Sequence, residues 1–258
     1  MNTELTRSIE SPRQIATVEI AEGDVRAIVA NFAPVPDADR ATQSYRNLAP
    51  SYDESCSTIV GIRARAMAQL AIQPGETVAD VACGTGATLV QLGLAVGDDG
   101  AAIGLELSTD MAELANQRIE DAGLTGRCQM RVGAIESYKD HVSYDALLFC
   151  YTHDVLQSPR ALQSLFAHAR DGARAVVVGA RFLPWWWGFP LNLFTGYRAR
   201  RYLTTFRGLR EPWRLLVNHC PDFRVIGSDH LGTSYLGVGI YKPNASLTLG
   251  KQHAKDPV

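Results

Sequence analysis

A buried strand that leads directly into a glycine turn and then a helix constrains this chain more than any other feature. Residues 77–83 form a mainly apolar run of strand length, and Gly84-Thr-Gly86 follows at once. Glycines let the backbone approach a ligand closely, and a helix that starts after them presents free N–H groups. This arrangement predicts a nucleotide-binding loop.

Short apolar strands alternate with amphipathic helices around this loop. Strands are expected at residues 77–83, 101–107, 128–133, 144–151 and 173–180, and helices at 59–70, 88–96, 109–122 and 159–169. The alternation predicts βαβ units and a doubly wound, mainly parallel, Rossmann-like α/β sheet. Residues 223–229 and 235–241 are expected to add an antiparallel hairpin, which brings the sheet to seven strands.

Length and composition fit one domain with appended helices. The 258 residues divide into an N-terminal helical cap and lead-in (1–72), the α/β domain (73–242) and a loose polar tail (243–258). A net charge of -2 gives no global attraction to nucleic acid or an anionic membrane. No run reaches the roughly 20 apolar residues of a membrane span, and no signal peptide is recognised. Five scattered cysteines without a C-x-x-C pair predict no metal site and a cytoplasmic protein.

The residues around the glycine loop narrow the choice of nucleotide. Dinucleotide sites place a third Gly or Ala three residues after the loop, but Leu89 stands there. The lysine of phosphate-binding loops is absent as well. Glu106 ends the second expected strand, about 20 residues after the loop, where a carboxylate accepts ribose hydroxyls. This combination favours a nucleoside without a pyrophosphate, and S-adenosylmethionine (SAM) is such a molecule.

Three segments carry a family resemblance. Residues 76–87 resemble motif I of class I SAM-dependent methyltransferases, and residues 104–111 resemble motif II. Residues 45–53 resemble the Tyr-Asp lead-in of the quinone C-methyltransferase and phospholipid N-methyltransferase branches. The resemblance implies a SAM-binding methyltransferase domain over residues 73–242, with an insertion at 181–220.

The resemblance also implies a set of cofactor-binding residues. Asp80 and the loop backbone would hold the methionine part of SAM, Glu106 the ribose, and Leu107 and Met111 the adenine. The complete set is Tyr52, Asp80, Ala82, Gly84, Thr85, Gly86, Glu106, Leu107, Met111, Gly133, Ala134, Ile135 and Cys150. Family members usually carry an Asp where this chain has Ala134, and Glu136 is a candidate substitute.

Polar side chains follow the fourth expected strand. Ligands of open α/β sheets bind outside the carboxyl ends of the strands, so Tyr151, His153 and Asp154 are expected to face the methyl donor as catalytic residues. His153, with an unperturbed pKa of about 6.5, is the natural general base. In the alternative reading, His153 and Asp154 only cap and orient the next helix. His230, at the end of the sixth strand, is a further candidate.

The insertion 181–220 combines aromatic residues with arginines. Its aromatic residues are Phe182, Trp185, Trp186, Trp187, Phe189, Phe194, Tyr197, Tyr202, Phe206 and Trp213, and its arginines are Arg198, Arg200, Arg201, Arg207, Arg210 and Arg214. As a roof over the active site, this segment would suit an aromatic or amphiphilic substrate with a carboxylate or phosphate. A homodimer interface and a shallow membrane contact stay open as alternatives. Nucleic acid is a weaker one, because no base-methylation motif is present.

These features together predict SAM-dependent methyl transfer to an oxygen, nitrogen or carbon atom of a small hydrophobic or aromatic metabolite. One alternative keeps SAM but changes the reaction, to cyclisation of SAM or a SAM-assisted rearrangement. Another is a non-catalytic SAM-binding protein that acts through the aromatic insertion.

Overall fold

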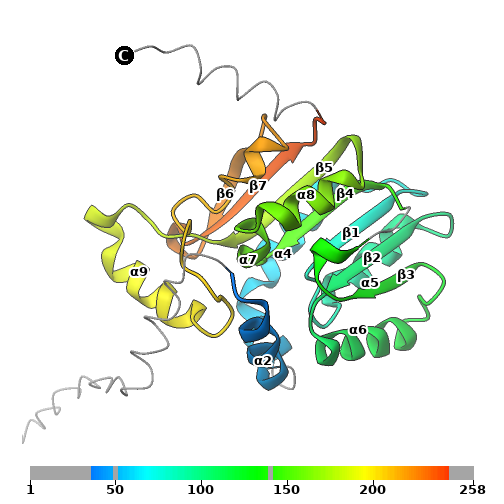
Figure 1. The fold of residues 1–258 in the computed structure, drawn as a ribbon, viewed down its shortest axis with the longest axis horizontal. Helices are drawn as coiled ribbons and strands as arrows, with labels where there is room; N and C mark the ends of the chain where they lie inside the picture. Colours follow the sequence, from blue (N-terminus) through cyan, green and yellow to red (C-terminus); the bar gives the residue numbers. More distant parts are fainter. Residues whose placement is uncertain (1–35, 49–51, 139–141, 244–258) are drawn as a thin grey trace, which may run out of the picture.

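The computed structural model describes residues 36–48, 52–138 and 142–243 (Figure 1). The part of the expected N-terminal helical cap that precedes residue 36 and the tail beyond residue 243 lie outside these ranges.

The described residues form one seven-stranded sheet with the order β3-β2-β1-β4-β5-β7-β6. Its strands are β1 (Thr77–Val81), β2 (Ala101–Glu106), β3 (Cys128–Val132), β4 (Tyr144–Cys150), β5 (Ala169–Ala180), β6 (Arg224–Asp229) and β7 (Ser234–Ile240). β1 to β5 pair in parallel, whereas β7 lies antiparallel to both β5 and β6. The predicted fold class is confirmed, including the closing hairpin.

Helices flank both faces of the sheet (Figure 1). They are α2 (Ala38–Leu48), α3 (Tyr52–Ser55), α4 (Val60–Leu70), α5 (Ala87–Val96), α6 (Thr109–Asp121), α7 (His153–Leu156), α8 (Pro159–Ala167) and α9 (Trp185–Ala199), with 3-10 turns at Ser57–Ile59, Ile135–Ser137, Leu216–Asn218 and His230–Gly232. The side chains of β4 alternate between the two cores, since Leu147 packs with α8 and Leu148 packs with α4 and α5. Burial on both faces explains why the strands are apolar throughout rather than alternating with polar residues.

The structure shifts several predicted boundaries. β1 ends at Val81, two residues early, because Ala82 takes a left-handed backbone with φ 50°. β5 begins at Ala169, four residues before the predicted start. α2 and α3 lie within the expected N-terminal helical cap and lead-in, and α7 and α9 are additions to the predicted helices.

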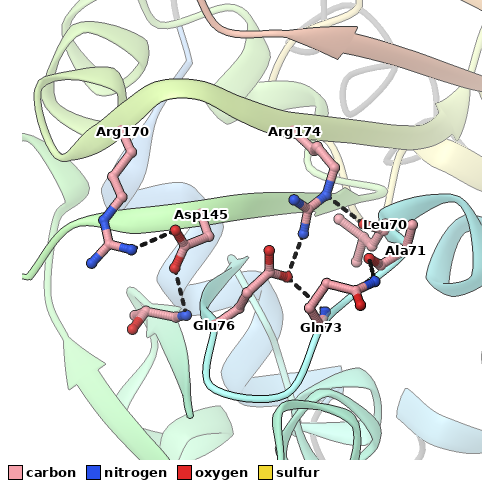
Figure 2. Close-up of polar contacts among 8 residues, drawn as sticks. Leu70, Ala71, Gln73, Glu76, Asp145, Arg170 and Arg174 are labelled. Carbon is pink, nitrogen blue, oxygen red and sulfur yellow. Dashed lines mark hydrogen bonds and ion pairs between the residues drawn. The ribbon is translucent and has the colours of Figure 1, made fainter.

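The amino ends of the strands are joined by a polar cluster (Figure 2). Asp145 of β4 accepts a 2.8 Å hydrogen bond from the backbone amide of Thr77 and a 2.6 Å bond from Arg170. Arg174 of β5 pairs with Glu76, which precedes β1. These contacts fix the starts of β1, β4 and β5 against one another, on the edge opposite the glycine loop.

Helix α9 is the main element of the insertion. Its buried residues are a narrow stripe, Gly188, Asn192, Gly196 and Ala199. The Asn192 amide accepts from the backbone N–H of Leu183 at 2.7 Å and donates to the Leu183 carbonyl at 2.9 Å, which anchors the helix to the segment after β5. Figure 1 shows α9 at the periphery of the molecule. In the part of the chain that the structure describes, no helix combines the length and apolarity needed to cross a membrane.

Candidate functional site

Two cavities open at the carboxyl ends of the central strands. The first, which we call the loop cavity, has a volume of about 530 Å³ and is lined in part by Ala82, Gly84, Glu106, Leu107, Gly133 and Ala134. The second, the aromatic cavity, has a volume of about 170 Å³ and is lined in part by Tyr151, Phe194, Arg198, His230, Ser234 and Tyr235. Both lie at the edge where open α/β sheets bind ligands.

The two cavities share one wall. The residues that line both are Tyr45, Tyr52, Tyr151, Thr152, His153, Tyr202 and Leu203. The rings of Tyr45 and Tyr52 meet edge to face with centroids 6.1 Å apart, and those of Tyr52 and Tyr202 do so at 6.2 Å. The Tyr45 hydroxyl also donates to the Tyr202 carbonyl at 3.0 Å. Three tyrosines from the lead-in and the insertion therefore stand between the cavities.

The glycine loop is held in place by Glu106. Oε2 of Glu106 accepts from the Gly84 amide at 2.9 Å, and Oε1 accepts from the Ser108 amide at 2.8 Å. Burial raises the pKa of this carboxyl, and the backbone N–H groups that point at it oppose the rise. Gly84 has φ 58°, a conformation that costs a residue without Cβ little. Loop and carboxylate thus form one rim of the loop cavity.

Asp80 lies beneath the loop and does not line either cavity. It is fully buried, and its Oδ2 accepts from the Thr88 hydroxyl at 2.6 Å while Oδ1 has no partner. Burial raises the pKa of Asp80 to about 7, against the Thr88 bond and the nearby Arg63 guanidinium.

Arg63 is a residue that our reading of the sequence missed. Its Nε is buried without a hydrogen-bond partner, and its guanidinium lies beside the thiol of Cys150. The available clue was its spacing: Arg63 sits three residues before Ala66 and seven before Leu70, on the edge of the helix face that packs on the sheet.

Thr85 and Gly86 serve packing rather than the cavity walls. The Thr85 hydroxyl donates to Asp53 at 2.6 Å, and Asp53 also pairs with Arg118, so α3 is tied to the loop and to α6. A Cβ on Gly86 would come within 2.9 Å of the Ala115 Cβ, so this glycine lets α5 and α6 approach closely.

Nine of the thirteen residues expected to bind the cofactor line the loop cavity. They are Tyr52, Ala82, Gly84, Glu106, Leu107, Gly133, Ala134, Ile135 and Cys150. Asp80, Thr85 and Gly86 lie behind this surface, and so does Met111, which is fully buried. Glu136 also lines the cavity, and it accepts from the Ser158 hydroxyl at 2.9 Å. The roles of all these residues stay predictions.

His153 lies in the shared wall and is almost fully buried. Its Nε2 is 2.9 Å from the Arg207 carbonyl, so Nε2 must carry the proton and Nδ1 the lone pair. Nδ1 is buried and has no partner. Burial lowers the pKa of His153 to about 4, so the ring is neutral at pH 7.

Asp154 ties α7 to the insertion. Its Oδ2 accepts from the amide of Thr204 at 2.9 Å and from the Thr204 hydroxyl at 2.6 Å, while Oδ1 is buried without a partner. Burial raises the pKa of this carboxyl, and the Thr204 bonds oppose the rise. Asp154 lines the loop cavity and not the aromatic one.

A chain of polar side chains runs along the aromatic cavity. The hydroxyls of Tyr151 and Ser234 are 2.9 Å apart, and Nδ1 of His230 lies 3.2 Å from the Ser234 hydroxyl. Nε2 of His230 faces the Thr58 carbonyl at 3.2 Å and is therefore the protonated nitrogen. Nδ1 is then an acceptor, and the bonds run from Tyr151 through Ser234 to His230. Tyr151 and His230 both take left-handed backbones, with φ 59° and φ 50°, a strain that is typical of functional sites.

The insertion contributes less to the cavities than the sequence suggested. Of its ten aromatic residues, only Phe194 and Tyr202 line a cavity. Trp185, Trp186 and Trp187 are exposed and line neither cavity, so these three residues do not support the reading of the insertion as a roof over the substrate. The reason is that the narrow buried stripe of α9 consists of small residues and Asn192, which leaves the large side chains outside.

Comparisons with known proteins agree with this geometry. Residues 78–172 match a family model described as a methyltransferase domain. The demethylmenaquinone methyltransferase of Oceanobacillus iheyensis is 27% identical over 151 residues, which cover 56% of this chain and 63% of that protein. The 2-phytyl-1,4-naphtoquinone methyltransferase of a Nostoc species is 27% identical over 52% of this chain and 62% of its own length. The chain thus spans somewhat less than two thirds of these relatives.

Solved structures share the fold. A SAM-dependent O-methyltransferase from Thermotoga maritima superposes with a TM-score of 0.53 at 17% identity, over 70% of this chain and 65% of that one.

Proposed function

Because this chain carries a class I, SAM-dependent methyltransferase domain, we propose that it binds SAM in the loop cavity and methylates a small aromatic or amphiphilic molecule held in the aromatic cavity. The observation that carries this proposal is the wall shared by the two cavities. The methyl donor in the loop cavity and the methyl acceptor in the aromatic cavity would meet at Tyr45, Tyr52 and Tyr202. Holding two reactants in contact is most of what catalysis of methyl transfer requires.

The residues of the loop cavity fit SAM. Its volume of about 530 Å³ lies within the range of ligand sites. The Glu106 carboxylate at the rim suits ribose hydroxyls. An ammonium group near the loop would favour the ionised form of the buried Asp80 carboxyl, whose Oδ1 has no partner. SAM supplies an electrophilic methyl group on a sulfonium, and aromatic ring faces attract such cations. Tyr45, Tyr52 and Tyr202 would provide those rings.

Two groups are candidates for the base that removes a proton from the substrate that is methylated. Nδ1 of His153 carries a lone pair and has no hydrogen-bond partner in the shared wall. Burial lowers the pKa of His153 to about 4, so the ring holds a second proton poorly at neutral pH. The chain from Tyr151 through Ser234 to His230 could instead move a proton from the wall to a histidine at the rim of the aromatic cavity. We favour this second route, because each of its links is a hydrogen bond.

The aromatic cavity favours an acceptor with a ring and a polar edge. The hydroxyls of Thr152 and Tyr235 are buried without partners, so a substrate oxygen would satisfy them. Arg198 adds a cation for a carboxylate, phosphate or phenolate. Relatives that are named as quinone methyltransferases support a quinol or a similar phenol as the acceptor class.

Incubation of the purified full chain with methyl-labelled SAM and a panel of naphthoquinols, benzoquinols and simple phenols tests the proposal. We expect a labelled organic product and S-adenosylhomocysteine in equal amounts. If SAM binds but methylthioadenosine forms without a methylated product, non-methylating SAM chemistry replaces the proposal. If neither product forms from any member of the panel although SAM binds, the acceptor class is wrong.

The cofactor assignment has its own test. Asp80→Ala should weaken SAM binding at least tenfold in calorimetry, because it removes the carboxylate that is buried beneath the loop, whereas His153→Ala should weaken it far less. Equal SAM affinity of the Asp80 variant and the wild-type protein would show that the loop has been misread.

A further inference from the structure

The outer face of α9 is an unusually apolar surface for a protein exterior. Its members are Trp185, Trp186, Trp187, Phe189, Leu193, Phe194 and Tyr197, and all of them are at least 40% exposed. Trp186 is 84% exposed and Trp185 66%. No charged residue occurs between Trp185 and Tyr197. We call these seven side chains the α9 apolar face. A contiguous patch of this kind marks an interaction site.

We propose that the α9 apolar face docks this protein on the surface of an anionic lipid bilayer. The helix of 15 residues is about 22 Å long, at 1.5 Å per residue, and offers Trp, Phe and Leu for the boundary between head groups and acyl chains. An interfacial helix of this kind lies in the plane of the membrane and does not cross it.

The spread of the tryptophans around the helix favours lipid over a protein partner. Consecutive residues of an α-helix point about 100° apart, so Trp185, Trp186 and Trp187 extend over roughly 200° of the circumference. A folded partner, including a second copy of this chain, would cover one side of α9 and leave part of this arc in water. Acyl chains and head groups can surround all three indoles, which are amphipathic rings that prefer the interface.

Charge at the end of the helix favours an anionic surface. Arg198 and Arg201 are both exposed, and Arg200 lies between them at the end of α9. Near an anionic membrane such cations strengthen binding by their attraction to the head groups. The apolar face would insert while these arginines meet the head groups.

The α9 apolar face is also continuous with the aromatic cavity. Phe194 belongs to the face and lines the cavity, and Arg198, one turn further, lines it as well. An amphiphilic acceptor dissolved in the bilayer could therefore enter along α9. This last consequence depends on the proposed function, whereas the docking itself does not.

Vesicle binding of the full chain, measured without SAM, tests the docking. The double variant W186Q/L193Q removes two exposed side chains that line neither cavity. Its matched control is L94Q/L114Q, with two exposed leucines on α5 and α6. With vesicles of phosphatidylcholine and phosphatidylglycerol, we expect W186Q/L193Q to lower the partition coefficient at least tenfold and the control to change it less than twofold. Brominated acyl chains should quench the tryptophan fluorescence of the wild-type protein.

Two variants that each reverse one positive charge complete the experiment. R201E should weaken binding to these vesicles several-fold at low salt, while K242E, with the same change in charge beyond the end of β7, should not. The proposal is overturned if the wild-type protein does not bind, if W186Q/L193Q binds as well as it does, or if the two charge variants behave alike. It is also overturned if sedimentation shows a dimer that W186Q/L193Q dissociates. None of these results bears on turnover of SAM with a water-soluble acceptor, so the two proposals fail separately.

Discussion

The backbone amide of Gly84 donates to Oε2 of Glu106 over 2.9 Å, so the carboxylate at the end of β2 fixes the loop at the end of β1. The other oxygen of the same carboxylate accepts from the backbone amide of Ser108, the N-cap residue of α6. One side chain therefore joins two adjacent βα connections at the rim of the loop cavity.

Glu106→Gln should disturb both connections. A glutamine side chain has one acceptor oxygen, so its NH₂ group must face either the Gly84 or the Ser108 amide, and a buried N–H is left without a partner. We expect a loss of about 1–3 kcal/mol in the free energy of unfolding and at least tenfold weaker SAM binding. Urea denaturation and calorimetry measure the two effects. Glu113→Gln, at an exposed position on α6, is the control and should change neither. Unchanged SAM affinity of the Glu106 variant would refute a ribose role for this residue.

Gly86→Ala should destabilise the fold. The new Cβ would lie 2.9 Å from that of Ala115, on a backbone with φ 76°. Overpacking of this kind and the strained conformation together cost about 2–4 kcal/mol. Gly61→Ala on α4 is the matched control, because nothing lies within 4 Å of its Cβ, and it should be neutral or stabilising by up to about 1 kcal/mol. Thermal denaturation compares them. Similar melting temperatures for the two variants would disprove the close approach of α5 and α6.

His153 should make stability depend on pH. Burial lowers its pKa to about 4, so between pH 6.5 and pH 4 the unfolded chain binds a proton that the folded protein does not. The free energy of unfolding therefore falls as the pH falls through this window, by up to about 3 kcal/mol from this group. His153→Gln should remove that part of the slope. Urea denaturation at several pH values gives the difference between the two proteins, which should be constant above pH 7. If the free energies of unfolding of the wild-type protein and the variant change in parallel down to pH 4, His153 is not a buried neutral ring.

Ser234→Ala should slow catalysis without weakening cofactor binding. The substitution breaks the link between Tyr151 and His230, so we expect kcat to fall about 100-fold for an acceptor that loses a proton, with the KM for SAM nearly unchanged. The activity of the variant should recover partly at high pH, where the acceptor ionises by itself. Ser228→Ala on the edge strand β6 is the control. An unaltered kcat for Ser234→Ala would shift the role of base to His153.

The sheet could be predicted because its strands are short apolar runs with turns between them, and the helices that cover it carry an apolar stripe. Helix α4 shows this well: Ile62, Ala66 and Leu70 are spaced for one face and are fully buried. The helices α3 and α7 have four residues each, too few for a periodic pattern. Their position depends on contacts that local sequence does not express.

Site residues that lie at the ends of strands could be predicted from the sequence. Site residues that are brought together from distant segments could not. Tyr151 and Glu106 end or follow strands, and both line a cavity. Tyr45 and Tyr202 are 157 residues apart and touch only because the lead-in and the insertion fold over the same edge. The sequence left open whether the aromatic residues of the insertion would line a cavity or lie exposed, because that depends on which side of α9 packs against the rest of the protein.

The polar cluster at the amino ends of β1, β4 and β5 has a consequence for how such a protein can change over evolution. Arg174, Glu76 and Asp145 lie at the opposite edge of the sheet from both cavities (Figure 2). Because effects of substitutions at well-separated positions usually add independently, stability can change at one edge without a change in the cavities at the other.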